Sequence, residues 1–542
     1  MRDNQSISNE PAGLKEFIEN HVATVEPKTR EAVLAEWEAA TTGKEEASME
    51  AARRRAELMR IYADVGAYER LKQWNSGPVP ADPLLARQLT LLYLAFSEGQ
   101  IDEESIQLIT SLEREAESTF TNYRGLFQGR LVSDNDIARI LSLETDSRLL
   151  REAWEAGKQV GQQVSDIVLR LVRRRNLAAR RAGFENHYQR SLALAELDEA
   201  DLFRLADDLR RRTDRPFAEA KARLDASLSQ RFGIPVEDLR PWHYSDPFFQ
   251  RPPQVDGVNL DSLFAGRDIV KLAVRTYDGL GMDVRPILIR SDLYARPGKN
   301  QHAFCVDVDR AGDIRVLCNL ESDHRWAETM LHELGHGVYD FYTDRQLPYL
   351  LRQPAHTLTT EGVAMLMGRL SLEEEWLLEV AGVPSAQVEA LLPTLQAQRR
   401  LTSLVFVRWA LVMMYFERAL YQDPDQDLNT LWWDLVESLQ FLHRPEWRHA
   451  PDWAAKIHLA LYPVYYHNYL LGELMASQLQ QRLQKEFGGI VDRPSVGRFL
   501  IEAIFRPGAR WDWSELVERA TGERLSAAPL ASDLGASLAT SS

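Results

Sequence analysis

The pentapeptide His332-Glu-Leu-Gly-His336 contains residues whose types and spacing suit metal chemistry. On an α-helix, residues four apart lie on one face, one turn above the other, so the two imidazoles can bind the same Zn²⁺ ion. Glu333 lies about 100° further around such a helix, where its carboxylate can reach a water molecule on the open side of the metal. The motif therefore predicts a zinc hydrolase in which Glu333 is the general base.

The alternative is a structural helix on which two of the 12 histidines happen to fall four residues apart. Two glycines argue against this alternative. Gly335 and Gly337 lie inside the helical pattern, where each costs about 1 kcal/mol relative to alanine. Glycine at such positions indicates that another segment packs too close for a Cβ atom.

A catalytic zinc ion takes three protein ligands and one water molecule, so a third ligand is needed. His356 and Glu361 are the candidates downstream. Glu361 is favoured because it opens an apolar helical segment, where an unpaired carboxylate is costly, whereas His356 lies in a loop with proline. The alternative for Glu361 is an acid at a helix N-terminus, stabilised by the macrodipole. Asp340 is a candidate to orient a metal-bound imidazole, or a surface residue.

The elements that must position these residues are mostly helices. Apolar residues recur at helical spacing over Gly13–Ala226, Leu260–Gly281 and Glu361–Leu483. Prolines mark a loop-rich crossing at about Gly233–Gly257. A last helix is expected near Trp513–Thr521, before a tail rich in Ser, Ala and Leu.

The one clear β signal lies between Leu288 and Leu320, directly before the metal helix. Two short alternating segments flank a turn candidate and predict a β-hairpin. If Ala311-Gly312 is the two-residue turn, Cys305 and Cys318 lie opposite each other and could form a cross-strand disulfide. Two reduced cysteines are the alternative, which is favoured in a cytosol.

Composition excludes several function classes. The chain has 542 residues and a net charge of −16, which argues against nucleic acid or an anionic membrane as the main partner. Arginine runs such as Arg173–Arg175 lie in helical patterns and are expected on solvated faces. The longest apolar segment, Leu401–Tyr421, contains Arg408 and Glu417 and is interpreted as a buried helix rather than a membrane span. Residues 1–12 lack the features of a secretory signal, so a cytoplasmic location is expected.

Several motifs together resemble the angiotensin-converting-enzyme family of zinc peptidases. They are His332–His336 with the spacing to Glu361, Gly298-Lys-Asn-Gln-His-Ala-Phe-Cys, Lys456-Ile-His458 with Tyr466 and Tyr469, Trp154-Glu-Ala-Gly-Lys-Gln-Val-Gly, and Trp513-Ser-Glu-Leu. The likeness is patchy but runs in order from about Leu141 to Gly522. The oligoendopeptidase F and thimet oligopeptidase family has the same metal arrangement and a similar strand.

The resemblance implies a mainly α fold, in which two helical lobes flank a deep central cleft and a small β-hairpin lies next to the metal helix. The expected division is an N-terminal helical lobe at 13–257, a catalytic region at 258–525 and a flexible tail at 526–542. The expected cofactor is one Zn²⁺ ion. The resemblance implies that its ligands are His332, His336 and Glu361.

The resemblance also implies roles for residues outside the metal site. The substrate backbone would pair with the edge strand at Ala303, Cys305 and Asp307. Two residues, His458 and Tyr469, would stabilise the tetrahedral intermediate. The C-terminal side of the substrate would contact Tyr466, and its terminal carboxylate would bind Lys456. Because one extra residue lies between His458 and the tyrosines, Tyr465 could hold either tyrosine role.

The chain departs from the family pattern at three places. His467 and Asn468 stand where the family has a chloride-binding arginine, and Met365 stands where it has an acid. The glutamine that helps to bind the terminal carboxylate has no match near Trp242. These departures put chloride activation and strict dipeptide release in question and leave the hydrolytic residues intact.

The expected function is zinc-dependent hydrolysis of oligopeptides with release of dipeptides from the C-terminus. An endo-oligopeptidase of the oligoendopeptidase F type is the alternative within the enzymes. A non-catalytic, zinc-stabilised scaffold that binds peptides is the alternative outside them, and the intact Glu333 argues against it because a structural metal site needs no base.

Overall fold

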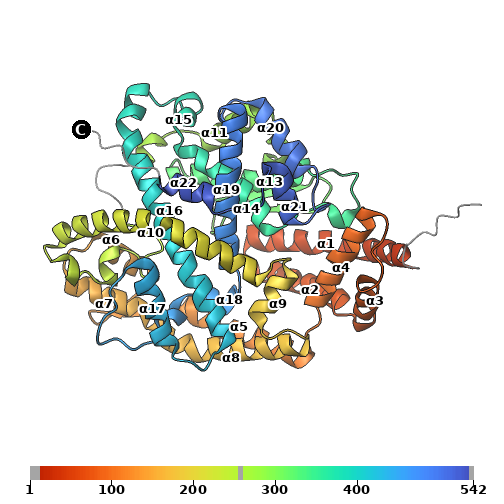
Figure 1. Ribbon diagram of the computed structural model, residues 1–542, viewed down its shortest axis with the longest axis horizontal. Helices are drawn as coiled ribbons and strands as arrows, with labels where there is room; N and C mark the ends of the chain where they lie inside the picture. The colour runs from red at the N-terminus through yellow and green to blue at the C-terminus, as the bar shows by residue number, and fades with distance from the viewer. Residues whose placement is uncertain (1–12, 254–259, 536–542) are drawn as a thin grey trace, which may run out of the picture. The chain divides into compact units, whose positions relative to one another are not determined.

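Helices dominate the computed structural model, which describes residues 13–253 and 260–535 (Figure 1). Within these residues, strands occur only in two antiparallel two-stranded sheets, so the predicted mainly α class is confirmed. The chain divides into two compact units, each assembled from segments that are distant in the sequence. Predictions for residues 1–12, for 254–257 in the loop-rich crossing and for the end of the tail lie outside the described residues.

Unit 1 consists of residues 13–100, 260–392 and 471–526. Its elements are α1 (Leu14–Thr42), α2 (Glu45–Tyr62), α3 (Val65–Asn75), α4 (Pro83–Glu98), η3 (Leu260–Leu263), α11 (Ile269–Gly279), α12 (Arg285–Leu288), β3 (Phe304–Asp307), β4 (Ile314–Leu317), α13 (His324–Tyr342), η4 (Tyr349–Leu351), α14 (Thr357–Arg369), η5 (Leu370–Leu372), α15 (Glu374–Glu379), α20 (Pro494–Leu500), the π-helix η7 (Ile501–Phe505) and α21 (Trp513–Thr521). The last of these helices was predicted at the same residues.

Unit 2 consists of residues 101–253, 393–470 and 527–535. Its elements are α5 (Glu103–Asn122), β1 (Gly125–Phe127), β2 (Arg130–Val132), α6 (Asp134–Leu143), α7 (Ser147–Lys158), α8 (Val160–Arg181), α9 (His187–Leu194), α10 (Glu199–Phe232), η1 (Val236–Asp238), η2 (Pro241–Tyr244), α17 (Leu428–Gln440), η6 (Asp452–Ala455), α18 (His458–Leu461) and α22 (Ala528–Gly535). Two long helices, α16 (Ser385–Gln422) and α19 (Tyr466–Phe487), belong to one unit at one end and to the other unit at the other end.

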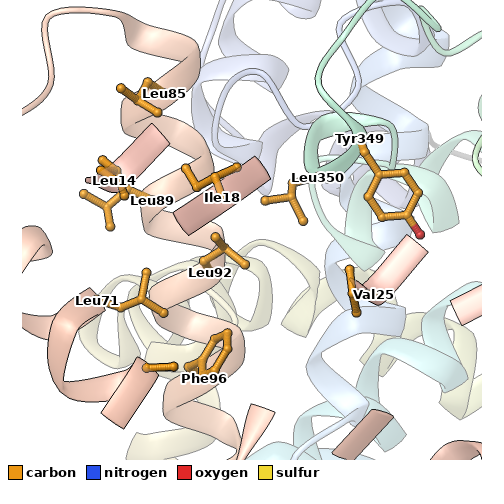
Figure 2. Close-up of a cluster of buried hydrophobic side chains, with 11 residues drawn as sticks. Leu14, Ile18, Val25, Leu71, Leu85, Leu89, Leu92, Phe96, Tyr349 and Leu350 are labelled. Carbon is orange, nitrogen blue, oxygen red and sulfur yellow. The ribbon is translucent and has the colours of Figure 1, made fainter. Parts of the chain in front are cut away.

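A hydrophobic cluster holds the N-terminal helices of unit 1 together. Figure 2 shows side chains from α1, α3, α4 and η4 that point toward one another. Leu14 and Leu71 are fully buried, and Phe96 is 1% exposed. Full burial of such a side chain contributes about 1.5–3 kcal/mol, so this cluster ties the segment 349–351 to the first hundred residues.

These units do not coincide with the predicted division at residue 257. Residues 13–100 group with the segment that carries the pentapeptide because α1 packs on the hairpin region: the rings of Trp37 and Phe304 lie 6.0 Å apart, and Asn300 N–H donates to the Ala40 carbonyl. Such contacts join residues far apart in sequence and leave no local signal.

Within the predicted tail, residues 528–535 form the helix α22. Leu530 and Leu534 are buried, and Nε of Arg400 donates to the Leu534 carbonyl over 2.6 Å. The apolar side chains of this low-complexity segment are therefore sufficient to hold α22 against the rest of unit 2.

The hairpin lies where the sequence predicts it, but its register differs. Cys305 pairs with Val316, not with Cys318, and both cysteines are free thiols. The loop is longer than the predicted two residues: Val308 N–H donates to the Asp313 carbonyl, which leaves four residues between them. The Asp309 carboxylate accepts backbone N–H groups inside this loop and stabilises it.

Among residues 13–253 and 260–535, no helix is both long and apolar enough to cross a membrane. As predicted, Arg408 and Glu417 of the apolar segment are buried, at 0% and 3% exposure.

Candidate active site

The pentapeptide lies on α13 of unit 1, as its spacing predicts. The helix starts at a standard cap, in which the Asp323 carboxylate accepts from Trp326 N–H. Its apolar face is buried, including Leu331 and Leu334. The two histidines therefore project from one face of a helix that is fixed in the core of the unit.

Close packing brings α14 against α13. A Cβ atom at Gly335 would lie 2.7 Å from the Cα of Ala364, so only glycine allows the two helices to approach this closely. On its other side, α14 meets α19: a Cβ at Gly362 would lie 2.8 Å from Met475, and one at Gly472 would lie 3.1 Å from the Cβ of Glu361. The predicted reason for Gly335 is confirmed, and the same packing aims Glu361 at the histidines.

Gly335→Ala is expected to weaken metal binding by pushing α14 away from α13. The added methyl meets backbone, which cannot rotate aside, and overpacking of this kind costs about 1–3 kcal/mol. Zinc affinity, measured by competition with a chelator, should fall together with the melting temperature. Gly337→Ala is the matched control, because its Cβ would meet the end of the Ile287 side chain at 3.3 Å, which can move. Equal effects of the two variants would contradict the packing argument.

Three ligand atoms converge at this packed junction. The Nε2 atoms of His332 and His336 lie 3.2 Å apart. Oε2 of Glu361 lies 3.7 Å from Nε2 of His332 and 4.0 Å from Nε2 of His336. Donor atoms at 2.0–2.2 Å from a tetrahedral zinc ion lie about 3.4 Å from one another, so the spacing and the His₂Glu donor set fit Zn²⁺. Among the described residues, this is the one such group of three.

His356, the other candidate for the third position, has a different task. Its Nδ1 accepts from Leu358 N–H over 2.9 Å and caps the N-terminus of α14. Because that cap starts the helix on which Glu361 lies, His356 fixes the position of the carboxylate without joining the group.

The residue that orients His336 is Thr360, not the predicted Asp340. Oγ1 of Thr360 lies 2.7 Å from Nδ1 of His336, which leaves Nε2 for a metal. Asp340 instead faces Asp307 and Arg310, and its burial raises its pKa well above the usual range. Thr360 is 24 residues from His336, so the sequence spacing carried no signal for it.

Burial sets the charge state of the group. It lowers the pKa of His332 to about 4 and that of His336 to about 3, so both imidazoles are neutral and have a free lone pair at neutral pH. Burial raises the pKa of Glu361 to about 7 and that of Glu333, which the Glu361 charge also raises, to about 8. Two buried acids beside two neutral imidazoles form an environment that favours a bound cation.

The edge strand β3 lies against this group. The backbone N–H of Cys305 donates to the Glu333 carboxylate, and this contact lowers the pKa of that acid. β3 pairs only with β4 among the described strands, and β4 also bridges to Asp292 on its other side. Ala303 directly precedes the strand. No described strand other than β4 pairs with β3, so its other edge is open except at the Cys305 N–H, which Glu333 accepts. The Asp307 side chain is engaged in its own turn, where it accepts from Arg310 N–H.

The remaining predicted site residues lie in unit 2. Lys456 follows η6 and is 9% exposed, and burial lowers its pKa to about 8. Its Nζ donates to Oε1 of Gln250 over 2.8 Å and lies 5.2 Å from the centroid of the Trp409 ring. The motifs of the sequence did not single out Gln250, which stands eight residues beyond Trp242.

His458 begins α18, and its ring lies 4.9 Å from that of Tyr466. Burial lowers the pKa of His458 to about 4, and its Nδ1 is buried without a hydrogen-bond partner in the described part of the chain. The Tyr466 hydroxyl accepts from Trp409 over 2.9 Å, and the Tyr469 ring lies 5.6 Å from that of Tyr466. Tyr465 also packs on Tyr469, at 5.2 Å, so the three tyrosines Tyr465, Tyr466 and Tyr469 form one cluster.

Two family models match the chain. The model described as Peptidase family M3 matches residues 141–536, well over half of the sequence, including α13, α14 and the His458–tyrosine segment. The model described as Angiotensin-converting enzyme matches residues 8–217. No match is found among curated proteins. Both families that the motifs resemble are therefore confirmed as relatives, and the chain belongs to peptidase family M3: it is a metallopeptidase that acts on peptides.

Proposed function

We propose that this protein is a zinc-dependent oligopeptidase that releases dipeptides from the C-terminus of its substrates. The metal ligands are His332, His336 and Glu361, with Glu333 as the general base. The observation that carries the metal assignment is the mutual spacing of the three ligand atoms, between 3.2 and 4.0 Å.

Glu333 moves the proton in this mechanism. A bound zinc ion supplies a water molecule whose pKa is lowered to about 7 and polarises the scissile carbonyl. The Glu333 carboxylate takes the proton from the attacking water and delivers it to the leaving amine. The Cys305 N–H donates to that carboxylate and orients it.

The substrate is held in an extended form in this proposal. Its backbone adds to the edge at Ala303, Cys305 and Asp307 as an extra strand, with the Cys305 carbonyl as the partner at that residue because the Cys305 N–H donates to Glu333. His458, neutral at physiological pH, and Tyr469 donate hydrogen bonds to the carbonyl oxygen as negative charge develops on it. Tyr466 contacts the C-terminal side of the peptide, and Tyr465 is the alternative for either tyrosine role.

Lys456 supports the release of dipeptides over internal cleavage. The one hydrogen-bond acceptor of its ammonium group in the described residues is the neutral amide of Gln250. The buried ammonium group of Lys456 bonds to no carboxylate in the part of the chain that the structure describes. It is therefore suited to bind a ligand that carries a carboxylate, such as the C-terminus of a peptide.

Peptides with a free C-terminus should be cleaved faster than the same peptides after amidation. Loss of one charge-assisted hydrogen bond costs about 1.5–3 kcal/mol, so kcat/KM should fall about 10- to 100-fold. Lys456→Met should reduce cleavage of the free acid by a similar factor and leave the amidated peptide unaffected, which makes the amide an internal control. Product masses from a mixed peptide set measure both.

Equal rates for free and amidated peptides would contradict dipeptide release. They would favour the alternative, an endo-oligopeptidase of the oligoendopeptidase F type, which the match to Peptidase family M3 supports. The non-catalytic scaffold predicts no turnover by either the apo or the zinc-loaded protein.

A further inference from the structure

The turn between α18 and α19 contains a strained residue. Val464 has a φ of 53°, in the left-handed region that β-branched residues rarely occupy, and it is 6% exposed. Such a conformation persists only when the surrounding structure holds it. The turn of residues 462–465 joins His458 to Tyr466 and Tyr469, so its shape decides how the histidine and the tyrosines lie relative to one another.

Glu417 holds this turn from α16. The Val464 N–H donates to Oε1 of Glu417 over 2.7 Å, and both groups are buried. Burial of an acid at 3% exposure is unfavourable, and it raises the pKa of Glu417 to about 8. An apolar side chain would pack at lower cost, so the hydrogen bond to Val464, together with the nearby charge of Arg175, is what favours a carboxyl group here.

Arg175 holds the adjoining helix α18. The sequence places it in an arginine run expected on a solvated face, but it is 3% exposed. Its guanidinium donates to the Ala460 carbonyl over 2.7 Å and to the Leu459 carbonyl over 3.5 Å. These are carbonyl groups at the C-terminal end of a one-turn helix, which otherwise lack intrahelical partners. Glu113 and the Tyr421 hydroxyl accept from the same guanidinium and fix its orientation.

We propose that Glu417 and Arg175 are positioning residues, which hold the 462–465 turn and α18 so that His458 and the tyrosines of α19 keep the arrangement needed for peptide hydrolysis. The inference rests on the proposed roles of His458 and Tyr469. Neither positioning residue contacts the substrate in this scheme. Their effect on the reaction passes through the backbone of the turn.

The first test compares Glu417→Met with Glu417→Gln. Glutamine keeps an oxygen that accepts from Val464 N–H, so its kcat should stay within about threefold of wild type. Methionine leaves the N–H without an acceptor, and kcat should fall about 10- to 100-fold with little change in KM, because a misplaced catalytic group slows the chemical step. Zinc content should be the same in both variants. Equal losses in the two variants, or a loss that appears only in KM, would overturn the proposal.

A second test relieves the backbone strain at Val464. Glycine adopts a positive φ without a Cβ penalty, so Val464→Gly removes the need for a holding contact. Glu417→Met should therefore reduce kcat less in the Val464→Gly background than in wild type. Thr213→Val, which removes a buried hydroxyl elsewhere in unit 2, is the control, and its effect on kcat should be the same in both backgrounds. Independent effects of Glu417→Met and Val464→Gly would contradict a role through the turn.

Hydrogen exchange separates this inference from the proposed function. Deuterium uptake in a peptide that contains the Val464 amide should rise in Glu417→Met and stay low in Glu417→Gln. If His458→Gln and Tyr469→Phe leave kcat unchanged, the proposed catalytic roles fail, whereas the exchange result still reports whether Glu417 holds the turn. Unchanged deuterium uptake in Glu417→Met would exclude a positioning role for Glu417, whatever the activity of the other variants.

Discussion

Glu333→Gln should abolish peptide hydrolysis while the protein still binds zinc. The amide cannot accept the proton of the attacking water, and loss of a general base reduces kcat by about a thousandfold or more. Because glutamine has nearly the same volume, the buried site on α13 keeps its packing, and an amide oxygen can still accept from the Cys305 N–H. Measurement of kcat and zinc content on the same sample tests the two halves of this expectation.

Glu328→Gln is the matched control for Glu333→Gln. Glu328 lies on the same helix but is exposed, so the same chemical change there should leave turnover within about twofold of wild type. Hydrolysis by the Glu333→Gln protein at near the wild-type rate would show that another group is the base. A loss of zinc along with activity would assign Glu333 a structural role instead.

Glu361→Gln should have the second large effect, on metal affinity. Removal of a partner outside the ligand shell typically weakens metal binding about 10- to 100-fold, and loss of a ligand should exceed this. Thr360→Val removes the partner of His336 Nδ1, so it should fall in that smaller range. The expected order of zinc affinity is wild type, then Thr360→Val, then Glu361→Gln, as measured by chelator competition and elemental analysis.

Met365→Leu, one helical turn after Glu361, is the control for this series. Its sulfur packs near Gly472 and lies outside the ligand group, so affinity should not change. Activity should follow zinc occupancy in every variant and return when zinc is restored at high concentration. Full zinc binding by Glu361→Gln would exclude it as a ligand, and absence of bound metal in the wild-type protein would support a coincidental pair of histidines.

Much of the local structure could be predicted from the sequence. The helix of the pentapeptide, the hairpin before it, the burial of the apolar segment 401–421 and the helix at Trp513–Thr521 all follow from patterns within about 20 residues. The predictions from the sequence were wrong where a local pattern was compatible with two structures. The hairpin register shifted because the carboxylate of Asp309 stabilises a longer loop than Ala311-Gly312 alone would form.

Contacts between residues far apart in the sequence could not be predicted from local patterns. Arg175 belongs to a run that looks solvated, yet it is buried against carbonyls more than 280 residues later in the chain. Gln250 has no motif around it and was found only through its contact with Lys456. A side chain's partner across such separations depends on how helices pack, and single-sequence patterns carry little of that information.

The sequence by itself indicated the two histidines and the proposed base, because an i, i+4 spacing on a helix is a local property, and it left two candidates for the third ligand. Only the tertiary structure placed Glu361 rather than His356 beside the two histidines, gave His336 the partner Thr360 in place of Asp340, and showed why Gly335 must lack a side chain. The physical reason is the same in each case: α14 brings Thr360 and Glu361 to the histidines only because it packs within backbone contact of α13, and that distance is set by the fold as a whole.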